Sequence, residues 1–128
     1  MAAVARLTRG DHRVVHGHPW VYANEIHSVE PAVAPGAVVT VLSSSGHFIG
    51  RGYFNPRSQI AIRLLTREDE PVDRAFFARR LEQALDFRRR VMAGQTSYRL
   101  VHAEADFLPG LIVDKFGDYL VFQTLALG

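Results

Sequence analysis

The order of hydrophobic and polar positions divides the chain into two stretches of short strands, separated by one amphipathic segment with helical period. In the first stretch, β-branched and aromatic runs alternate with compact turns rich in glycine, proline and serine. Such spacing is typical of a small barrel or open roll. The pattern predicts strands over residues 3–7, 37–42, 47–54 and 59–66.

The helical period begins after the charged connector 67–71 and continues to Gly94. Asp73 is suited to cap the helix at its start, and Gly94 is suited to end it. The last stretch predicts strands at 98–102, 111–116 and 119–125, the final two joined by a primed turn at Gly117-Asp118.

In that hairpin four large apolar residues share one face, which are Leu111, Val113, Leu120 and Phe122. Three strands with an uncovered apolar face form an incomplete layer, so we expect the chain to be a piece cut from a larger protein. The fold class expected for the whole sequence is α+β.

One hairpin, residues 51–65, combines cations with planar side chains. Asn55-Pro56-Arg57-Ser58 has the composition of a type I turn. Five side chains on or beside this turn suit phosphate contact and base stacking: Arg51, Tyr53, Asn55, Arg57 and Arg63. An ordinary surface hairpin with solvated arginines is the alternative interpretation.

Closing this hairpin over its four turn residues pairs Tyr53 with Ile60 and Arg51 with Ile62, which places Arg51 and Tyr53 on an apolar face. Either Tyr53 is itself partly buried, or a bulge at Gly50 or Gly52 redirects the strand. Arg57 and Asn55 on the turn are therefore better candidates for RNA contact than Tyr53.

The basic run 9–20 contributes a second group of candidates, which are Arg9, Arg13, His18 and Trp20. A single helical turn is expected between Gly10 and Gly17, with Asp11 as its cap. Val21, Tyr22 and Ile26 are expected to be apolar anchors of a short element. The pair His16 and His18 lacks a third ligand, and the chain has no cysteine, so a metal site is disfavoured.

Composition limits the possible functions. The 128 residues are 48% hydrophobic, without cysteine, membrane-length apolar run or signal-peptide core, so we expect an intracellular soluble protein. Lys115 is the only lysine among 15 basic residues. Net charge is +3 over residues 1–63, +1 over 64–93 and −2 over 94–128, so a polyanion site belongs in the front half.

Enzymatic signatures are weak. The sequence has no dinucleotide-binding glycine motif, phosphate-binding loop or nucleophile elbow. Acidic residues gather only at expected turns and strand ends near the end of the chain, which are Glu104, Asp106, Asp114 and Asp118. A hydrolase using these carboxylates or the histidines therefore ranks last among the hypotheses.

Three segments in order resemble one bacterial family: HPWVYANEI (18–26), GRGYFNPRSQIAIRLLT (50–66) and YRLVHAEADFLPGLIVDKFGDYLVFQ (98–123). They are similar to the N-terminal part of the S-adenosylmethionine-dependent 23S rRNA (cytosine-5) methyltransferases of the RlmI type. Family members often carry glycine where this chain has Phe107, so the turn before Leu108-Pro109-Gly110 is expected to differ in shape.

The resemblance implies a PUA-like β pseudo-barrel that binds RNA at 1–66, a linking helix at 67–93, and the first strands of a truncated central α+β domain at 94–128. It implies 23S rRNA as the partner and the cytoplasm as the location, with no membrane partner. S-adenosylmethionine is implied for the full-length parent only, because the catalytic domain and its cysteine are absent here. No catalytic, cofactor or metal residue is therefore expected in this chain.

The resemblance also leaves room for a homodimer or for docking onto a catalytic domain. A freestanding RNA- or protein-interaction module, whose open sheet docks on a partner chain, is the alternative to an RNA-binding part of a methyltransferase.

Overall fold

The computed structural model describes residues 3–127, which fall into two compact units. We call residues 3–70 the first unit and residues 71–126 the second unit. Each contains one β-sheet, and the second also contains the long helix, so the expected α+β class is confirmed.

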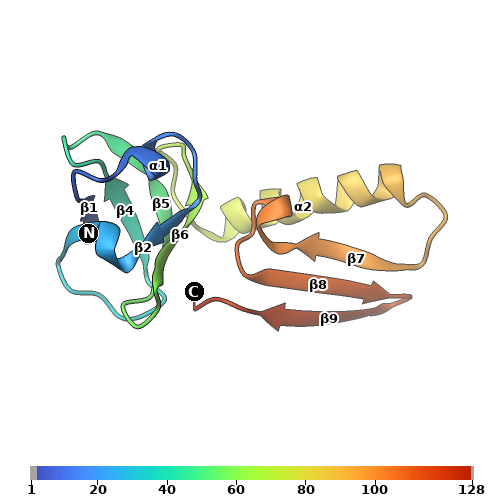
Figure 1. The fold of residues 1–128 in the computed structure, drawn as a ribbon. Helices are drawn as coiled ribbons and strands as arrows, with labels where there is room; N and C mark the ends of the chain where they lie inside the picture. Colours follow the sequence, from blue (N-terminus) through green and yellow to red (C-terminus); the bar gives the residue numbers. More distant parts are fainter. Residues whose placement is uncertain (1–2, 128) are drawn as a thin grey trace. The chain divides into compact units, whose positions relative to one another are not determined.

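A six-stranded sheet in the order β2-β6-β5-β4-β1-β3 forms the first unit (Figure 1). β1 runs parallel to β4, and the other neighbouring strands are antiparallel. The strands are β1 (Ala3–Leu7), β2 (Trp20–Tyr22), β3 (Ile26–Glu30), β4 (Val38–Leu42), β5 (Phe48–Phe54) and β6 (Ile60–Thr66).

The core of the first unit lies on one face of this sheet. Alternate residues of β4 are buried, as at Val39 and Val41, whereas the residues between them are half-exposed. The short helix α1 (His12–Val15) contributes Val14, which is fully buried, to the same cluster. Period-two alternation of burial in β4 therefore corresponds to one packed face.

Asp11 does not cap α1 with its side chain. Its carboxylate accepts a hydrogen bond from the Ser44 N–H, at 2.7 Å, in the loop between β4 and β5. Asp11 therefore occupies the expected N-cap position of α1, but its side chain makes no capping bond because a tertiary partner takes the carboxylate. Three elements of the first unit were also not predicted as such, namely the strands β2 and β3 and the 3₁₀ turn η1 (Ala23–Glu25).

The hairpin of β5 and β6 closes in a different register from the predicted one. Tyr53 pairs with Arg63, and Gly52 pairs with Leu64. The turn at Asn55 forms as expected, because the Ser58 N–H donates to the Asn55 carbonyl at 3.3 Å. The loop is nevertheless longer than the four predicted turn residues, since the Asn55 N–H donates to the Ala61 carbonyl at 2.7 Å.

The longer loop shifts the pairing of β5 with β6 beside the turn by three residues from the predicted one, and a β-bulge between Arg51 and Gly52 shifts it by one more residue farther along. Ile62 and Leu64 then lie in the core, while Tyr53 and Arg63 share the opposite face and are half-buried. Both alternatives left open by the sequence therefore hold, since Tyr53 is partly buried and the strand carries a bulge.

Helix α2 (Arg74–Val91) opens the second unit, and the Phe76 N–H donates to the Asp73 carboxylate at 2.9 Å. The predicted cap at Asp73 is confirmed. A three-stranded antiparallel sheet and the turn η2 follow, with the bounds β7 (Ser97–His102), η2 (Ala103–Asp106), β8 (Leu111–Phe116) and β9 (Tyr119–Thr124).

Helix α2 covers only part of this sheet. Ala84 of the helix packs with Val101, Leu108 and Val113, all buried. Every residue of β9 is exposed, including Phe122 at 63%. The expectation that nothing covers the sheet was therefore wrong for β7 and β8, and it holds for β9.

The turn after η2 places Phe107 in a backbone conformation that a glycine would adopt without strain. Phe107 adopts φ +59°, in the left-handed region that favours glycine. The residue type that distinguishes this chain from the expected pattern therefore occupies a position at which a side chain is strained.

Candidate RNA interface

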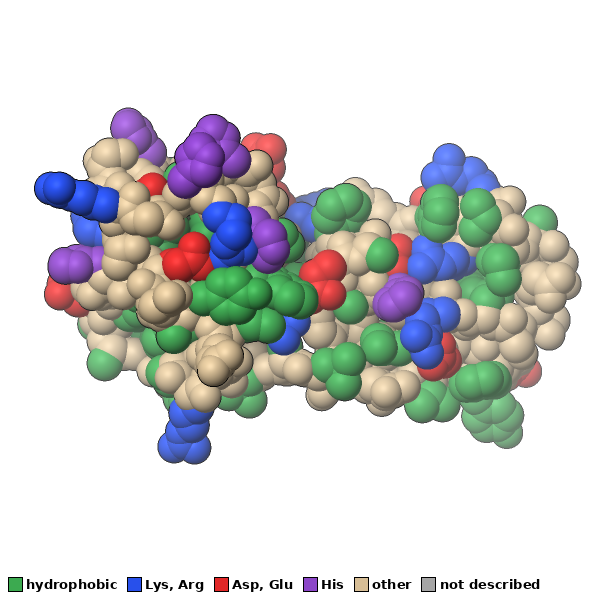
Figure 2. Space-filling model, in the orientation of Figure 1, with side chains coloured by type: hydrophobic (Ala, Val, Ile, Leu, Met, Phe, Trp, Pro, Cys, Tyr) green, Lys and Arg blue, Asp and Glu red, His purple; other side chains and the backbone are tan. Residues whose placement is uncertain are grey.

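Cationic and imidazole side chains of the first unit define its electrostatics. Figure 2 shows most of the histidine side chains on the visible face gathered over the first unit. Three arginines, Arg6, Arg9 and Arg57, are exposed there, and none of them pairs with a carboxylate among residues 3–127. These uncompensated charges are available to a polyanion.

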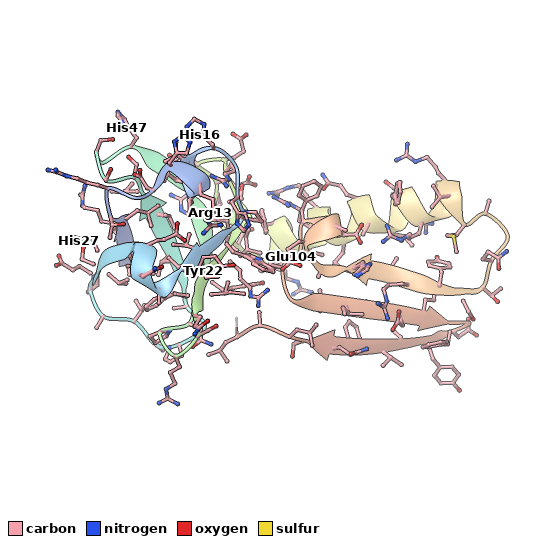
Figure 3. The ribbon with its side chains drawn as sticks, viewed as in Figure 1. Arg13, His16, Tyr22, His27, His47 and Glu104 are labelled. Atoms are coloured by element: carbon pink, nitrogen blue, oxygen red, sulfur yellow. The ribbon has the colours of Figure 1, made fainter. Side chains whose placement is uncertain are left out.

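Arg13 is held by several intramolecular contacts instead. Its guanidinium donates to the Trp20 carbonyl at 2.9 Å and to the Glu25 carboxylate. The same guanidinium lies over the Tyr22 ring, 4.8 Å from its centroid (Figure 3). Arg13, predicted as an RNA contact, therefore orients β2 and the Tyr22 ring.

The Tyr22 ring borders a hollow of about 430 Å³ lined by Tyr22, Ala23, Asn24 and Gln59. Ala23 N–H donates to the Gln59 carbonyl at 2.8 Å, which ties the two walls together. A ring and two amide side chains around one hollow offer a stacking surface with adjacent donors and acceptors. Unpaired RNA bases are recognised through this combination.

The loop that supplies Gln59 also carries the predicted turn residues. The Asn55 side-chain oxygen accepts from the Arg57 N–H at 3.0 Å, which fixes the turn. Arg57 is exposed, and its guanidinium is free of carboxylate partners among the described residues. Of the two turn residues, Asn55 therefore shapes the loop, and Arg57 presents a charge.

Arg51, by contrast, is engaged on all sides. Its guanidinium donates to the Thr40 hydroxyl at 3.2 Å, the Glu70 carbonyl at 2.9 Å and the Asp69 carboxylate at 2.8 Å. It also lies 5.2 Å from the centroid of the Phe48 ring. The structure gives Arg51 the role of joining β4, β5 and the connector after β6.

Trp20, Arg63 and Tyr53 form a row across three neighbouring strands. Arg63 pairs with Trp20 on one side and Tyr53 on the other, and its guanidinium lies 5.1 Å from the Trp20 ring. Burial raises the pKa of the Tyr53 phenol above its ordinary value. All three residues are half-buried, so the predicted planar and cationic groups of this row pack against one another.

His18 has a structural partner as well. Its Nδ1 accepts from the Trp20 N–H at 3.1 Å, so the ring supports the start of β2. The carboxylates at the end of the chain form ion pairs: Asp106 with Arg88, and Asp114 with Arg99. Within residues 3–127, no group of three side chains is arranged to hold a metal ion, and no helix has the length and apolarity to cross a membrane.

Sequence reasoning missed Tyr22, Asn24 and Gln59. Tyr22 was expected to be an apolar anchor, and this was wrong, because the ring is 36% exposed and the adjacent Val21 is buried. The alternation within Trp20-Val21-Tyr22 carries that signal, since neighbouring residues of a strand face opposite sides.

Comparison with known proteins identifies the class of the first unit. A family model described as a PUA-like domain matches residues 7–67. The first unit therefore contains a PUA-like domain, in agreement with the curled six-stranded sheet and with the resemblance noted from the motifs.

The whole chain is also similar to longer curated proteins. It is 40% identical over 131 residues to ribosomal RNA large subunit methyltransferase I of Vibrio cholerae, covering 100% of this chain and 33% of that protein. The protein of the same name from Salmonella arizonae is 39% identical over 126 residues, covering 95% and 31%. The resemblance inferred from three motifs is confirmed, and the chain spans about a third of the length of these relatives.

Solved structures show the same fold. A candidate SAM-dependent methyltransferase from Streptococcus mutans superposes with a TM-score of 0.78 at 18% identity, covering 98% of this chain and 33% of that one. A second structure, a candidate methyltransferase complexed with SAH, gives 0.76 at 17% identity. At this identity the likeness concerns the fold alone.

Proposed function

We propose that this chain binds single-stranded RNA through its PUA-like domain and positions ribosomal RNA for methylation. The observation that carries the proposal is the hollow lined by Tyr22, Asn24 and Gln59, with Arg13 holding the Tyr22 ring. An unpaired base stacks on the ring while the amides bond its edge. The names of the relatives that are 39–40% identical to this chain indicate ribosomal RNA as the target.

The arginines take different parts in this interface. Arg57 and Arg9 contact phosphates, because both are exposed and without carboxylate partners in the described part of the chain. The remaining predicted residues support the shape of this surface and are not its primary RNA contacts. They are Arg13, His18, Trp20, Arg51, Tyr53, Asn55 and Arg63.

The domain assignment that accompanies this function is RNA binding by 1–66, a helical link at 67–93 and a supporting sheet at 94–128. S-adenosylmethionine and the catalytic groups belong to the longer protein in this scheme, which acts on 23S rRNA in the cytoplasm. This chain contributes recognition and no reacting group.

The test is a salt series of binding to a fluorescent single-stranded RNA. Because each arginine–phosphate contact on a single strand contributes about 0.7 to the slope of log K against log salt, Arg9→Gln and Arg57→Gln should each lower the slope by about that amount. Arg90→Gln, an equal charge change on the exposed face of α2, is the control and should leave the slope unchanged. Equal slopes for all variants, or an affinity no greater than that of a neutral protein at low salt, would contradict the proposal.

A second candidate function is self-association through β9. All its residues are exposed, and its outer edge has no strand partner in the described part of the chain, so β9 of a second copy can pair with it antiparallel. Phe122→Glu would then lower the mass seen by sedimentation equilibrium at high concentration. A monomer at every concentration would contradict this candidate.

A further inference from the structure

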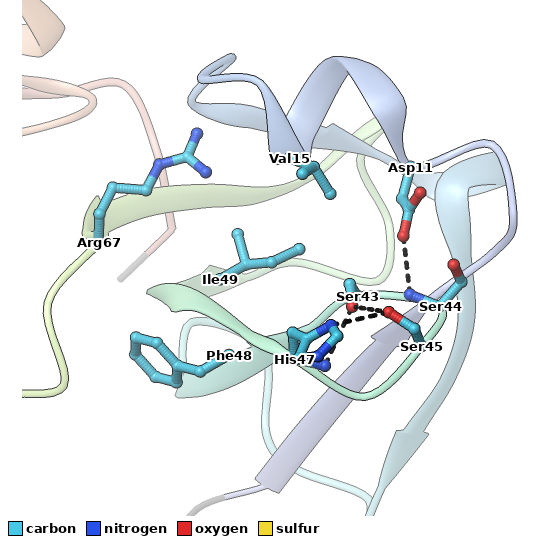
Figure 4. Close-up of a pocket in the computed structure, with 9 residues that line it drawn as sticks. All are labelled: Asp11, Val15, Ser43, Ser44, Ser45, His47, Phe48, Ile49 and Arg67. Carbon is cyan, nitrogen blue, oxygen red and sulfur yellow. Dashed lines mark hydrogen bonds between the residues drawn. The ribbon is translucent and has the colours of Figure 1, made fainter.

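A separate hollow of about 370 Å³ lies between α1 and the strand β5 (Figure 4). Its volume falls within the range of small-ligand sites, which is about 300–1,000 Å³. None of its lining residues borders the hollow beside Tyr22, so it is a distinct site within the first unit.

The middle of this hollow is apolar. Val15 lies on the α1 side, and Ile49 and Phe48 lie on the β5 side, as Figure 4 shows. Val15 is 46% exposed although it is a large aliphatic residue, and Ile49 on the opposite wall is 8% exposed. Apolar surface facing a slot from both sides suits a flat ring that excludes water from both walls.

The two ends of the slot are polar and differ in charge. Arg67 lies at one end, where its guanidinium donates to the Val14 carbonyl at 2.8 Å and the His18 carbonyl at 2.9 Å. These neutral acceptors fix the group without cancelling its charge, and no carboxylate pairs with it among residues 3–127. This end favours an anion.

At the other end, the hydroxyl of Ser45 lies 2.9 Å from Nδ1 of His47. Asp11 is also here, where it accepts from the Ser44 N–H. Its negative charge disfavours a phosphate at this end, while the hydroxyl and imidazole offer hydrogen bonds to a neutral polar edge. The slot thus has a cationic end, apolar walls, and an end that offers hydrogen bonds and carries the Asp11 carboxylate.

We propose that this slot binds one unpaired nucleotide of the RNA, with the phosphate at Arg67 and the base between Val15 and Ile49. The inference rests on the proposed RNA-binding function and adds a second nucleotide position to it. The base edge then meets the Ser45–His47 pair.

The experiment is titration of the isotope-labelled chain with the four ribonucleoside monophosphates, followed by amide chemical shifts. Saturable shifts are expected at Ser44, Ser45 and Ile49 for at least one nucleotide. Val15→Phe, which fills the slot without removing a hydrogen bond, should abolish them. Arg67→Gln should weaken binding about tenfold, the scale of a lost charge-assisted contact, and Arg90→Gln is the matched control that leaves binding unchanged.

Three results would contradict nucleotide binding in the slot. They are the absence of saturable chemical-shift changes, unchanged shifts in the Val15→Phe protein, and an equal affinity for inorganic phosphate, which would mean an adventitious ion only. Far-ultraviolet circular dichroism establishes that each variant is folded. RNA binding without nucleotide shifts at the slot would overturn this inference and leave the proposed function intact. Nucleotide binding at the slot without RNA binding would support the slot and contradict the function.

Discussion

The guanidinium of Arg13 lies 4.8 Å from the centroid of the Tyr22 ring while it also donates to the Glu25 carboxylate. Glu25 in turn accepts from the Tyr22 N–H at 2.9 Å. The ring is thereby held between a cation on one face and solvent beside the hollow. A stacking surface that is already oriented loses little entropy when a base binds.

Replacing the Tyr22 ring should weaken RNA binding without unfolding the domain. Tyr22→Ala is expected to cost about 1–3 kcal/mol of binding free energy, the usual value of one base–aromatic stack. Tyr22→Phe should retain most of the affinity, because the bond to Glu25 comes from the backbone. Fluorescence anisotropy with a single-stranded RNA measures the difference.

Tyr119→Ala provides the matched control, since Tyr119 is 77% exposed and lies in the second unit. An equal loss of affinity in the two alanine variants would show that Tyr22 is not the stacking residue.

Among the ion pairs described in the second unit, Arg88–Asp106 should contribute most to the free energy of unfolding. The two hydrogen bonds measure 3.0 and 2.7 Å, and the side chains are only 12% and 8% exposed. Arg88→Met should cost about 3 kcal/mol, because it leaves the buried Asp106 carboxylate unpaired. Urea denaturation followed by circular dichroism measures the loss.

Arg89→Met is the companion variant on the same helix. Arg89 and Asp86 are 3.8 Å apart and 67% and 69% exposed, so its loss should cost at most about 0.5 kcal/mol. Similar losses in the Arg88 and Arg89 variants would refute the assignment of stability to the buried pair.

Gly52 should not tolerate a side chain. An added Cβ would lie 2.2 Å from the Arg63 carbonyl oxygen and 2.8 Å from the Leu64 Cα, and both are backbone atoms. Gly52→Ala should therefore destabilise the first unit by about 3 kcal/mol, at the upper end of overpacking costs. Thermal unfolding is the measurement.

Gly10→Ala tests whether this cost is specific to the bulge. Its added Cβ would be 3.8 Å from the Thr8 hydroxyl oxygen, an ordinary contact. Equal melting temperatures for the Gly52→Ala and Gly10→Ala proteins would contradict the close approach of β5 and β6.

Tyr53 should titrate above the ordinary range of a tyrosine phenol. Burial favours the neutral phenol and raises the pKa of Tyr53 above 10.0, its ordinary value. The unfolded chain therefore loses this proton first, and stability falls as pH rises above about 10. Ultraviolet difference absorbance should show one late step that Tyr53→Phe removes, and Tyr98→Phe should leave it in place.

Local chemistry made much of the fold predictable. Asp73 caps α2 because its carboxylate meets an N–H three residues later, and the Gly117-Asp118 turn forms with Gly117 at φ +59°. Both depend on neighbouring residues alone. The RNA-binding surface was less predictable, because Arg51 and Arg13 were free cations in the sequence but have carboxylate partners in the structure.

The sequence by itself determined most of the strands, the long helix, the turn at Asn55 and the PUA-like character of the front half, since these depend on periodicity, turn chemistry and linked motifs. Only the tertiary structure decided which side chains are available. Ser44 took the Asp11 carboxylate, Asp69 took Arg51, and Glu25 and the Tyr22 ring took Arg13. Such contacts join residues far apart in the chain, so no local pattern encodes them.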